Sequence, residues 1–529
     1  MKNRVGISYA ETQAFSKLVI DYLADAPALQ PFYAHRPDVQ GIEQAIAAKA
    51  NHTINRTLLV DELKNQYATE TLTSKQVAHL EALLQPNCFT ITTAHQPNLF
   101  TGPLYFIYKI IHAIKLADEL NKQFPQQQFV PVYYMGSEDA DLDELGHFFI
   151  DGEKREWQTQ QTGAVGRMKT ENVEPLIRQL EGQFVQLPFG QYMVNLLRTA
   201  YSKPNIQEAT FSLVNQLFAE FGLLIVVPDN AALKRQFVSV IQRELEGNFS
   251  QPAVDATTAL LEQQYKVQVK GRPINMFYLD ASGARERIEK VGHQYVVNAL
   301  NLSWTKEEIF ALTESNPECF SPNVILRGLL QETILPNVVF IGGGGELAYW
   351  MELKAVFEKA NVPFPVLMLR NSLLLIDEKQ QALQRKLAWS YADLFQPLQT
   401  LLDAMAAANN DATIDVAKEE AQLQSQYSQW QEAVAKIDVT LQPYVASLHT
   451  AALKGLRALH KKMKRAARQQ LGDRGRQAEK LKAQLFPNGS LQERVENVMP
   501  FLAQYGPGLL QEIYDASPAI EPSFTIVDL

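Results

Sequence analysis

A turn-rich loop between two β-rich runs holds the first side chains suited to chemistry. His95 in this loop can exchange a proton with a ligand or contact a phosphate. A predicted helix at residues 104–120 follows, and the N-terminus of a helix offers free N–H groups to an anion. We expect substrate or nucleotide to contact six further residues here: Gln96, Asn98, Thr101, Gly102, Tyr105 and Lys109. The alternative is that His95 and Gln96 only satisfy the backbone of an irregular loop.

An acidic loop follows a second predicted strand, at residues 129–135. Five carboxylates occur within seven positions, whereas helix capping uses only one or two. Clustered carboxylates bind amines or Mg²⁺, and His147 could join them. We therefore expect a catalytic role for Glu138, Asp139 and Asp141, although at least half of the cluster should be structural.

Four consecutive glycines, residues 342–345, follow another apolar run. Because glycine lets a ligand or a second backbone come close, Gly344 and Gly345 are candidate binding residues, with Tyr349 one turn further on. The spacing matches neither G-x-G-x-x-G nor a P-loop, so it is a weak nucleotide signal. Glu346 either stabilises the start of a helix or holds a substrate amine.

A parallel sheet would bring these loops together. A short β-rich run occurs at residues 88–93 and a second predicted strand at 129–135. Similar buried-strand signals, near-continuous apolar runs typical of strands covered on both faces, follow at 223–227, 337–341 and 365–369. The helix between the first two runs is long enough for a parallel crossover. We predict an α/β fold with one doubly wound, Rossmann-like sheet, in which ligands bind beyond the carboxyl ends of the strands.

The rest of the chain interrupts or extends this sheet. We expect an N-terminal helical region at 1–86, core segments at 87–145, 206–245 and 323–377, connecting insertions at 146–205 and 246–322, and a helical coiled-coil arm with a C-terminal tail at 378–529. The second insertion contains a strand-like run at 273–279 and a hairpin signal at 280–283.

The arm carries a heptad pattern. Apolar residues alternate four and three positions apart at Leu423, Tyr427, Trp430, Val434, Ile437, Leu441, Tyr444 and Leu448. Pro443 is tolerated only in a first helical turn, so residues 438–443 could be the tip of an antiparallel hairpin whose returning helix runs to Leu485. Because an exposed apolar stripe is costly, we expect the arm to mediate a homodimer.

Residues 454–482 of the arm hold eleven Lys or Arg and two acids, which favours a solvated flank over an anion-binding face.

Composition limits the class of protein. The chain has 529 residues, of which 46% are hydrophobic and 20% charged, as in ordinary globular proteins. A net charge of -9 argues against a surface devoted to nucleic acid or anionic lipid. Two cysteines, Cys88 and Cys319, exclude a disulfide framework and suit a reducing compartment. With no signal peptide or membrane-spanning run recognisable, we expect a cytoplasmic protein without nucleic-acid or membrane partners.

Four motifs, at residues 101–109, 137–144, 344–350 and 485–494, together resemble the BshC family, the cysteine-adding enzymes of bacillithiol biosynthesis. The resemblance covers essentially the whole chain. It implies a Rossmann-like core related to class I aminoacyl-tRNA synthetases and nucleotidyltransferases, two connecting-peptide insertions, and a C-terminal coiled coil used for dimerisation. The implied reaction joins the carboxyl group of cysteine to the amine of glucosaminyl-malate.

This reaction needs an activated carboxyl group, so we expect ATP with Mg²⁺ as the activator. His95 and the helix after Gly102 would contact phosphate, and Lys109, Arg327 or Arg370 would pair with the malate carboxylates. Two alternatives remain. One is a nucleotide-sugar transferase that uses the same sheet and acidic loop, and the other is a non-catalytic scaffold whose coiled coil is the functional part.

Overall fold

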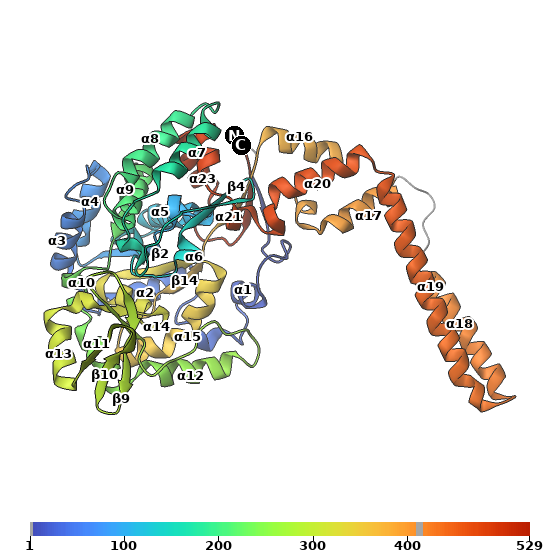
Figure 1. Ribbon diagram of the computed structural model, residues 1–529, viewed down its shortest axis with the longest axis horizontal. Helices are drawn as coiled ribbons and strands as arrows, with labels where there is room; N and C mark the ends of the chain where they lie inside the picture. The colour runs from blue at the N-terminus through green and yellow to red at the C-terminus, as the bar shows by residue number, and fades with distance from the viewer. Residues whose placement is uncertain (1–3, 409–415) are drawn as a thin grey trace. The chain divides into compact units, whose positions relative to one another are not determined.

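The computed structural model describes residues 4–408 and 416–529 (Figure 1). The chain divides into two compact units, which we call the core unit (Met1–Leu375 with Ser490–Val527) and the arm unit (Ile376–Gly489 with Asp528–Leu529). The sequence predicted the arm and the tail as one region, 378–529, whereas the tail packs within the core unit. The reason is strand pairing, because β16 (Phe524–Asp528) lies antiparallel to β1 (Arg4–Ile7) next to β15 (Ser372–Ile376).

A five-stranded sheet in the order β14-β13-β2-β3-β6 forms the centre of the core unit. Its strands are β2 (Cys88–His95), β3 (Gln128–Met135), β6 (Leu224–Val226), β13 (Asn337–Gly342) and β14 (Val366–Leu369). Every neighbouring pair is parallel, which confirms the predicted doubly wound sheet. From β2 the chain builds outward through β3 and β6, and later adds β13 and β14 on the other side of β2.

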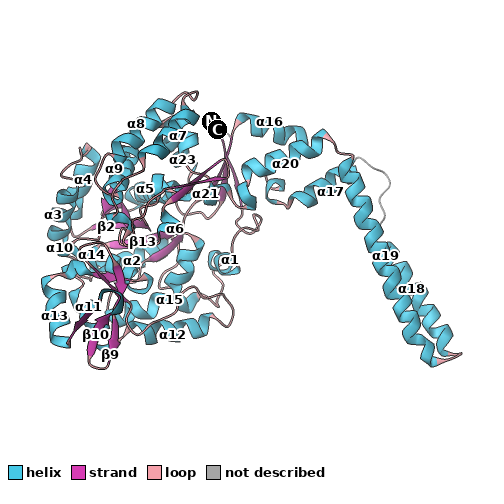
Figure 2. Cartoon of the chain, viewed as in Figure 1, coloured by secondary structure: helices cyan, strands magenta, loops and turns pink. Residues whose placement is uncertain are grey.

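Helices cover both faces of this sheet (Figure 2). On one face, α2 (Val39–Ala50) and α5 (Tyr105–Gln123) share a buried apolar cluster with the strands. The helix α15 (Gly344–Ala360) connects β13 to β14. The other helices of the core unit outside the insertions are α1 (Lys17–Leu23), α3 (Arg56–Gln66), α4 (Ser74–Leu83), α6 (Leu142–Leu145), α9 (Ile206–Phe218), α10 (Ala231–Arg235), α11 (Val238–Gly247), α14 (Val324–Ile334), α21 (Gln492–Val495), α22 (Met499–Tyr505) and α23 (Gly508–Ala516).

The two predicted insertions contain small antiparallel sheets and helices. The first has β4 (His147–Ile150), β5 (Glu153–Glu156), α7 (Glu174–Phe184) and α8 (Gly190–Tyr201). The second has α12 (Ser250–Leu261), β7 (Met276–Leu279), β8 (Arg285–Arg287), β9 (Glu289–Val291), β10 (Gln294–Val297), β11 (Leu302–Trp304), α13 (Lys306–Ser315) and β12 (Phe320–Pro322). The hairpin signal is confirmed, because Asp280 accepts backbone N–H groups across the turn between β7 and β8.

The arm unit is helical, with α16 (Glu378–Leu387), α17 (Leu398–Ala408), α18 (Val416–Ala435), α19 (Gln442–Gln469) and α20 (Asp473–Leu485). Helices α18 and α19 lie side by side as the predicted hairpin, and Pro443 falls in the first turn of α19 (Figure 1). The returning helix does not run unbroken to Leu485, since Gly472 between α19 and α20 adopts a φ of 54°. Among the described residues, none of the helices combines the length and apolarity needed to cross a membrane.

Candidate functional site

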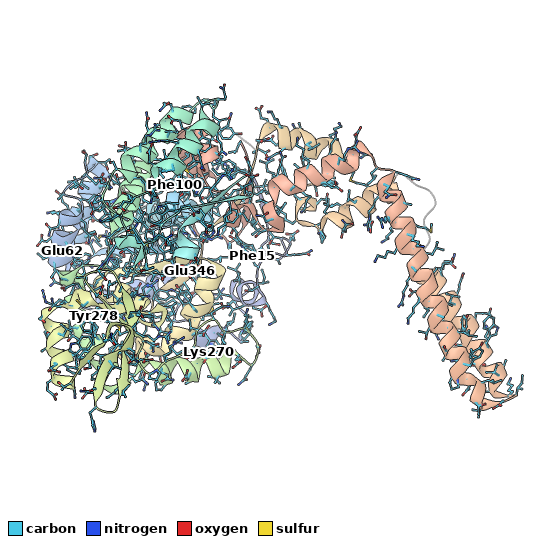
Figure 3. All side chains as sticks on the ribbon, viewed as in Figure 1. Phe15, Glu62, Phe100, Lys270, Tyr278 and Glu346 are labelled. Carbon is cyan, nitrogen blue, oxygen red and sulfur yellow. The ribbon has the colours of Figure 1, made fainter. Side chains whose placement is uncertain are left out.

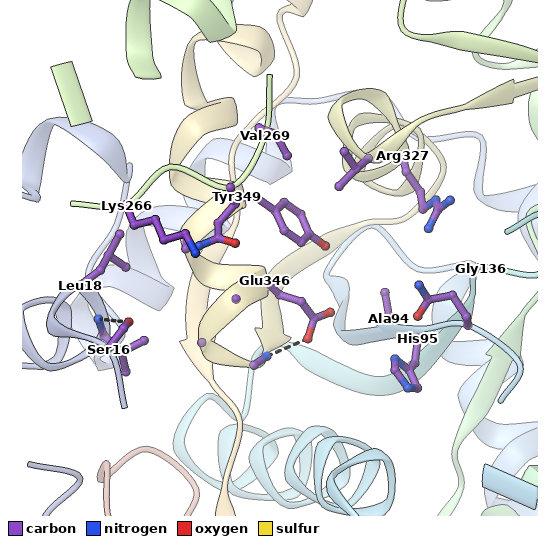
Figure 4. A pocket seen from close by; sticks show the side chains of 18 of the residues that line it. Ser16, Leu18, Ala94, His95, Gly136, Lys266, Val269, Arg327, Glu346 and Tyr349 are labelled. Atoms are coloured by element: carbon purple, nitrogen blue, oxygen red, sulfur yellow. Dashed lines mark hydrogen bonds between the residues drawn. The ribbon is translucent and has the colours of Figure 1, made fainter. Parts of the chain in front are cut away.

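A cavity of about 1240 Å³ opens at the carboxyl ends of β2 and β13, and its lining residues all belong to the core unit (Figure 4). These strands are neighbours, but the chain leaves β2 toward β3 and leaves β13 toward β14, on opposite sides. This divergence is the switch point at which open α/β sheets bind ligands. Of the predicted site residues, those that line the cavity are His95, Gln96, Tyr105, Asp139, Arg327, Gly344, Gly345, Glu346, Tyr349 and Arg370.

His95 is the last residue of β2, and its ring lies edge-on to Tyr105 with 5.5 Å between the ring centres. Its Nε2 atom is buried and has no hydrogen-bond partner. Burial, reinforced by the nearby charges of Lys109 and Arg370, holds the pKa of the imidazole well below its usual value. His95 is therefore neutral near pH 7 and can accept a hydrogen bond from a ligand, whereas its environment disfavours the positively charged imidazolium that would pair with a phosphate.

Lys109 and Glu346 neutralise each other inside this site. The Lys109 ammonium donates to both carboxylate oxygens of Glu346, at 2.9 and 2.8 Å, and to the backbone carbonyl of Ala94. Glu346 also accepts the N–H of Gly343 at 2.8 Å and so caps the start of α15. The helix-capping alternative for Glu346 is thus realised, and Lys109 is not free to pair with a ligand carboxylate.

Gly344 and Gly345, which follow β13, have different surroundings. An added Cβ at Gly344 would lie 2.8 Å from the Val19 side chain of α1, so glycine there serves the packing of two helices. An added Cβ at Gly345 would meet nothing within 4 Å, and this position faces open space in the cavity. Only the second of these positions leaves room for a ligand.

The acidic loop divides between structural and cavity positions. Glu138 is buried in an ion pair with Lys234, and exposed Asp141 accepts the N–H of Glu144 at 3.0 Å as the N-cap of α6. Neither of these two predicted catalytic residues lines the cavity. Asp139 and Glu144 do line it, and Glu144 was not among the predicted site residues.

Asp139 and Glu144 have opposite pKa shifts. The Oδ2 atom of Asp139 lies 3.2 Å from Nη1 of Arg327 and accepts a hydrogen bond from Nε2 of Gln96, also at 3.2 Å. Burial opposes ionisation of Asp139, but Arg327 and its other partners prevail and lower its pKa. Burial together with the charges of Asp141 and Asp139 raises the pKa of Glu144. The cavity therefore contains one firmly ionised carboxylate beside one that gains a proton more easily.

No group of three or more His, Cys, Asp or Glu side chains is placed to bind a metal within residues 4–408 and 416–529. His147, the expected helper of the acidic loop, has its Nδ1 2.8 Å from the carbonyl of Asp143. Mg²⁺ is commonly held by one or two carboxylates together with phosphate oxygens of a ligand. Asp139 and Glu144 supply carboxylates for that arrangement, so the donor set fits a Mg²⁺ that enters with a nucleotide.

Arg370 is occupied by the C-terminal tail. Its guanidinium makes a two-pronged contact with Glu493, at 2.9 and 2.8 Å, and stacks over the Tyr105 ring at 5.0 Å. Both members of the pair are buried. The motif at residues 485–494 thus reaches the site through this pair, and Arg370 is a structural neighbour of the cavity rather than a free cation.

Asn98, Thr101 and Gly102 do not line the cavity, contrary to the expectation for this loop. They form a buried turn in which Gly102 has a φ of 61°. The side chain of Asn497 donates to the carbonyls of Phe100 and Gly102, at 2.8 and 2.6 Å, and fixes the turn from the tail. Glycine is needed here for backbone conformation, not for approach of a ligand.

Sequence reasoning missed the wall contributed by the second insertion. Its basic residues that line the cavity are Lys266, Lys270, Arg272, Arg285 and Arg287. The available signal was the acid-free, basic stretch at residues 266–272 just before a strand. Tyr134 of β3 was also missed; its buried hydroxyl lines the cavity and has no hydrogen-bond partner.

Comparisons with known proteins agree with this architecture. Residues 4–371 match the family described as "Bacillithiol biosynthesis BshC, N-terminal Rossmann-like domain", and residues 373–529 match its "C-terminal coiled-coil domain". Relatives named "Putative cysteine ligase BshC" include those of Flavobacterium psychrophilum (39% identical, covering 98% of each chain), Flavobacterium johnsoniae (39%, 99% of each) and Christiangramia forsetii (36%, 98% of each). The matches span both units in order, and the chain belongs to the BshC family of bacillithiol biosynthesis.

Proposed function

We propose that this protein is a cysteine ligase of bacillithiol biosynthesis, which forms an amide bond between the carboxyl group of cysteine and the amine of glucosaminyl-malate. The observation that carries the proposal is the switch-point cavity, where neutral His95 and the carboxylates of Asp139 and Glu144 share one space with a basic wall. Near full-length similarity to relatives named as cysteine ligases supports it.

The proton chemistry follows from these groups. The attacking nitrogen becomes strongly acidic as the C–N bond forms, and the neutral, unpartnered imidazole of His95 would accept its proton at that stage. Glu144 would hold the ammonium form of the amine before that transfer. Tyr134, with its free hydroxyl, would donate to the carbonyl oxygen on which negative charge develops.

We infer that ATP with Mg²⁺ activates the cysteine carboxylate, because amide formation from a free carboxylate is uphill in water. ATP supplies the leaving group that makes this carbon reactive. The first turn of α15 at Gly345 would bind its phosphates, and Asp139 would bind the metal. The open space at Gly345 supports this placement.

We also infer a cytoplasmic homodimer. Cys88 and Cys319 are both free thiols, as suits a reducing compartment. In the arm unit, Trp430 and Tyr444 of the predicted heptad seam are 46% and 63% exposed on the α18–α19 hairpin, and a second copy would cover them.

The test is product formation by the purified full chain. With cysteine, glucosaminyl-malate, ATP and Mg²⁺, mass spectrometry should detect bacillithiol, and omission of ATP should abolish it. His95→Ala should lower kcat/KM by about 100-fold or more, as expected for loss of a general base. The exposed loop histidine His293 provides the control, and His293→Ala should keep full activity. Absence of product with every nucleoside triphosphate tested would refute the proposal.

A further inference from the structure

The second insertion lays a basic segment along one wall of the cavity. Residues 264–272 connect α12 to β7 without helix or strand, and they contain Lys266, Lys270 and Arg272 but no acid. None of these three cations forms an ion pair with a carboxylate of the described chain. Figure 4 shows Lys266 and Arg327 entering the cavity from different sides, and Figure 3 labels Lys270, another lining residue.

The cations expected to bind substrate are already neutralised. Lys109 is paired with Glu346, Arg370 with Glu493 and Arg327 with Asp139. An anionic ligand would therefore find uncompensated positive charge on the insertion wall. Arg285 and Arg287 of β8 extend that charge, and burial together with repulsion from Arg327 lowers the pKa of Arg285 to about 10, a shift that a bound anion would relieve.

A buried carboxylate holds this irregular segment in place. Glu352 of α15 accepts the backbone N–H of Gln268 at 2.6 Å and that of Val269 at 3.2 Å. Its side chain is buried, and it lies on the helix whose first turn carries Glu346. A second anchor is the hydroxyl of Tyr265, which donates to Asp21 at 2.8 Å. Glu352 thus ties the basic segment to α15, whose first turn lines the cavity, and Tyr265 ties it to α1.

We propose that residues 264–272 are an anion-binding wall, which receives a ligand group bearing two or more negative charges, and that Glu352 is the positioning residue that sets this wall. Two sources share that chemistry, namely a malate-type dicarboxylate and the phosphates of a nucleotide. The inference deepens the proposed function, because the wall lies in the same cavity, but its test requires no turnover.

Calorimetric titration of the full chain with malate, pyrophosphate and ADP tests the wall. The double variant Lys266→Ala/Lys270→Ala should bind at least one of these probes 10-fold or more weakly than wild type. Loss for malate alone assigns the wall to a dicarboxylate, and loss for pyrophosphate and ADP assigns it to phosphate. The control Lys379→Ala/Lys386→Ala removes the same charge from exposed positions of α16 and should bind as wild type does. Equal affinity of wild type and the cavity variant for every probe, or no binding of any probe to wild type, would overturn the proposal.

Amide exchange tests the positioning role. Glu352→Ala should speed hydrogen exchange at Gln268 and Val269, weaken binding of the same probe, and raise KM more than it lowers kcat. Glu352→Gln keeps one acceptor oxygen and should recover part of the affinity. If Glu352→Ala does not fold, Tyr265→Phe releases the other anchor and should give the same pattern. Faster exchange with unchanged affinity would show that Glu352 does not position a binding wall. Anion binding without product formation would instead sink only the ligase assignment.

Discussion

Two charged pairs at the cavity join distant parts of the chain. Lys109 meets Glu346, and Arg370 meets Glu493, with each carboxylate also receiving a backbone N–H, from Gly343 and Leu373 respectively. Buried ion pairs stabilise little compared with apolar residues of the same size, but removal of one partner leaves an unpaired buried charge. We therefore expect these pairs to act mainly by fixing the positions of the cavity walls.

The Arg370–Glu493 pair gives a direct prediction for stability. Glu493→Gln leaves the buried guanidinium uncompensated and should lower the free energy of unfolding by about 3–5 kcal/mol. The double variant Arg370→Met/Glu493→Leu removes both charges and should regain most of that loss. Chemical denaturation of the full chain measures both changes. A loss below about 1 kcal/mol for Glu493→Gln is typical of a solvated pair and would contradict this description.

The carboxyl group of Glu352 predicts a pH effect on stability. Burial raises its pKa from 4.5 to about 6, although the two N–H groups that it accepts act in the opposite direction. The folded state therefore holds this proton more tightly than the unfolded state, and the associated stability is present below pH 4.5 and lost as pH rises through about 6. Since one pKa unit corresponds to about 1.36 kcal/mol, wild type should lose about 2 kcal/mol relative to Glu352→Gln across that window. Denaturation curves at several pH values measure the difference, and a difference independent of pH would refute the assignment.

At the scale of elements, the turn that follows β2 depends on a contact with the C-terminal tail of the core unit. Gly102 has a φ of 61° and a ψ of -144°, and an added Cβ would lie 2.9 Å from the Asn98 side chain. Its carbonyl is held by Asn497, so the turn cannot relax without breaking that contact. The helix α5, which carries Tyr105 and Lys109, starts directly after this turn.

Gly102→Ala should therefore destabilise the protein by about 1–2 kcal/mol, the cost of left-handed backbone for a residue with a Cβ. Gly182 in α7 is the matched control, because an added Cβ there meets nothing within 4 Å and alanine favours a helix. Gly182→Ala should be neutral or stabilising by up to about 1 kcal/mol. Thermal unfolding of both variants measures these changes. Equal melting temperatures for the two variants would mean that the turn is not conformationally restricted.

The elements were predictable to very different degrees. All five strands of the sheet were predicted from short β-rich or apolar runs, whereas the order of the strands was not predicted and comes from the structure. The α18–α19 hairpin was predicted from its heptads and Pro443. The pairing of Lys109 with Glu346 was not predicted, because local sequence patterns carry no information about contacts between residues 237 positions apart. The wall at 264–272 was missed for a related reason, since an irregular segment has no periodicity to detect.

At the scale of the whole molecule, the chain combines a core unit that contains the cavity with an arm unit whose hairpin leaves apolar residues uncovered. Within α18 and α19, Trp430, Tyr444, Leu448 and Leu459 are between 41% and 63% exposed. A two-helix hairpin cannot bury both faces of its own seam, and soluble monomers seldom expose contiguous apolar stripes. The sequence pattern thus predicts an interface that one copy of the chain leaves open.

We therefore expect wild type to sediment as a dimer in analytical ultracentrifugation. Trp430→Glu/Tyr444→Glu places two charges in the stripe and should yield a monomer, because burying unpaired carboxylates in an apolar interface is strongly unfavourable. The control Gln422→Glu/Gln429→Glu adds the same charge at exposed positions of α18 outside the heptad seam and should remain dimeric. Unfolding of the core unit should be similar in all three proteins if the stripe serves association alone. A wild-type mass equal to one chain at every concentration, or a stripe variant that still dimerises, would show that the exposed residues of the hairpin have another role.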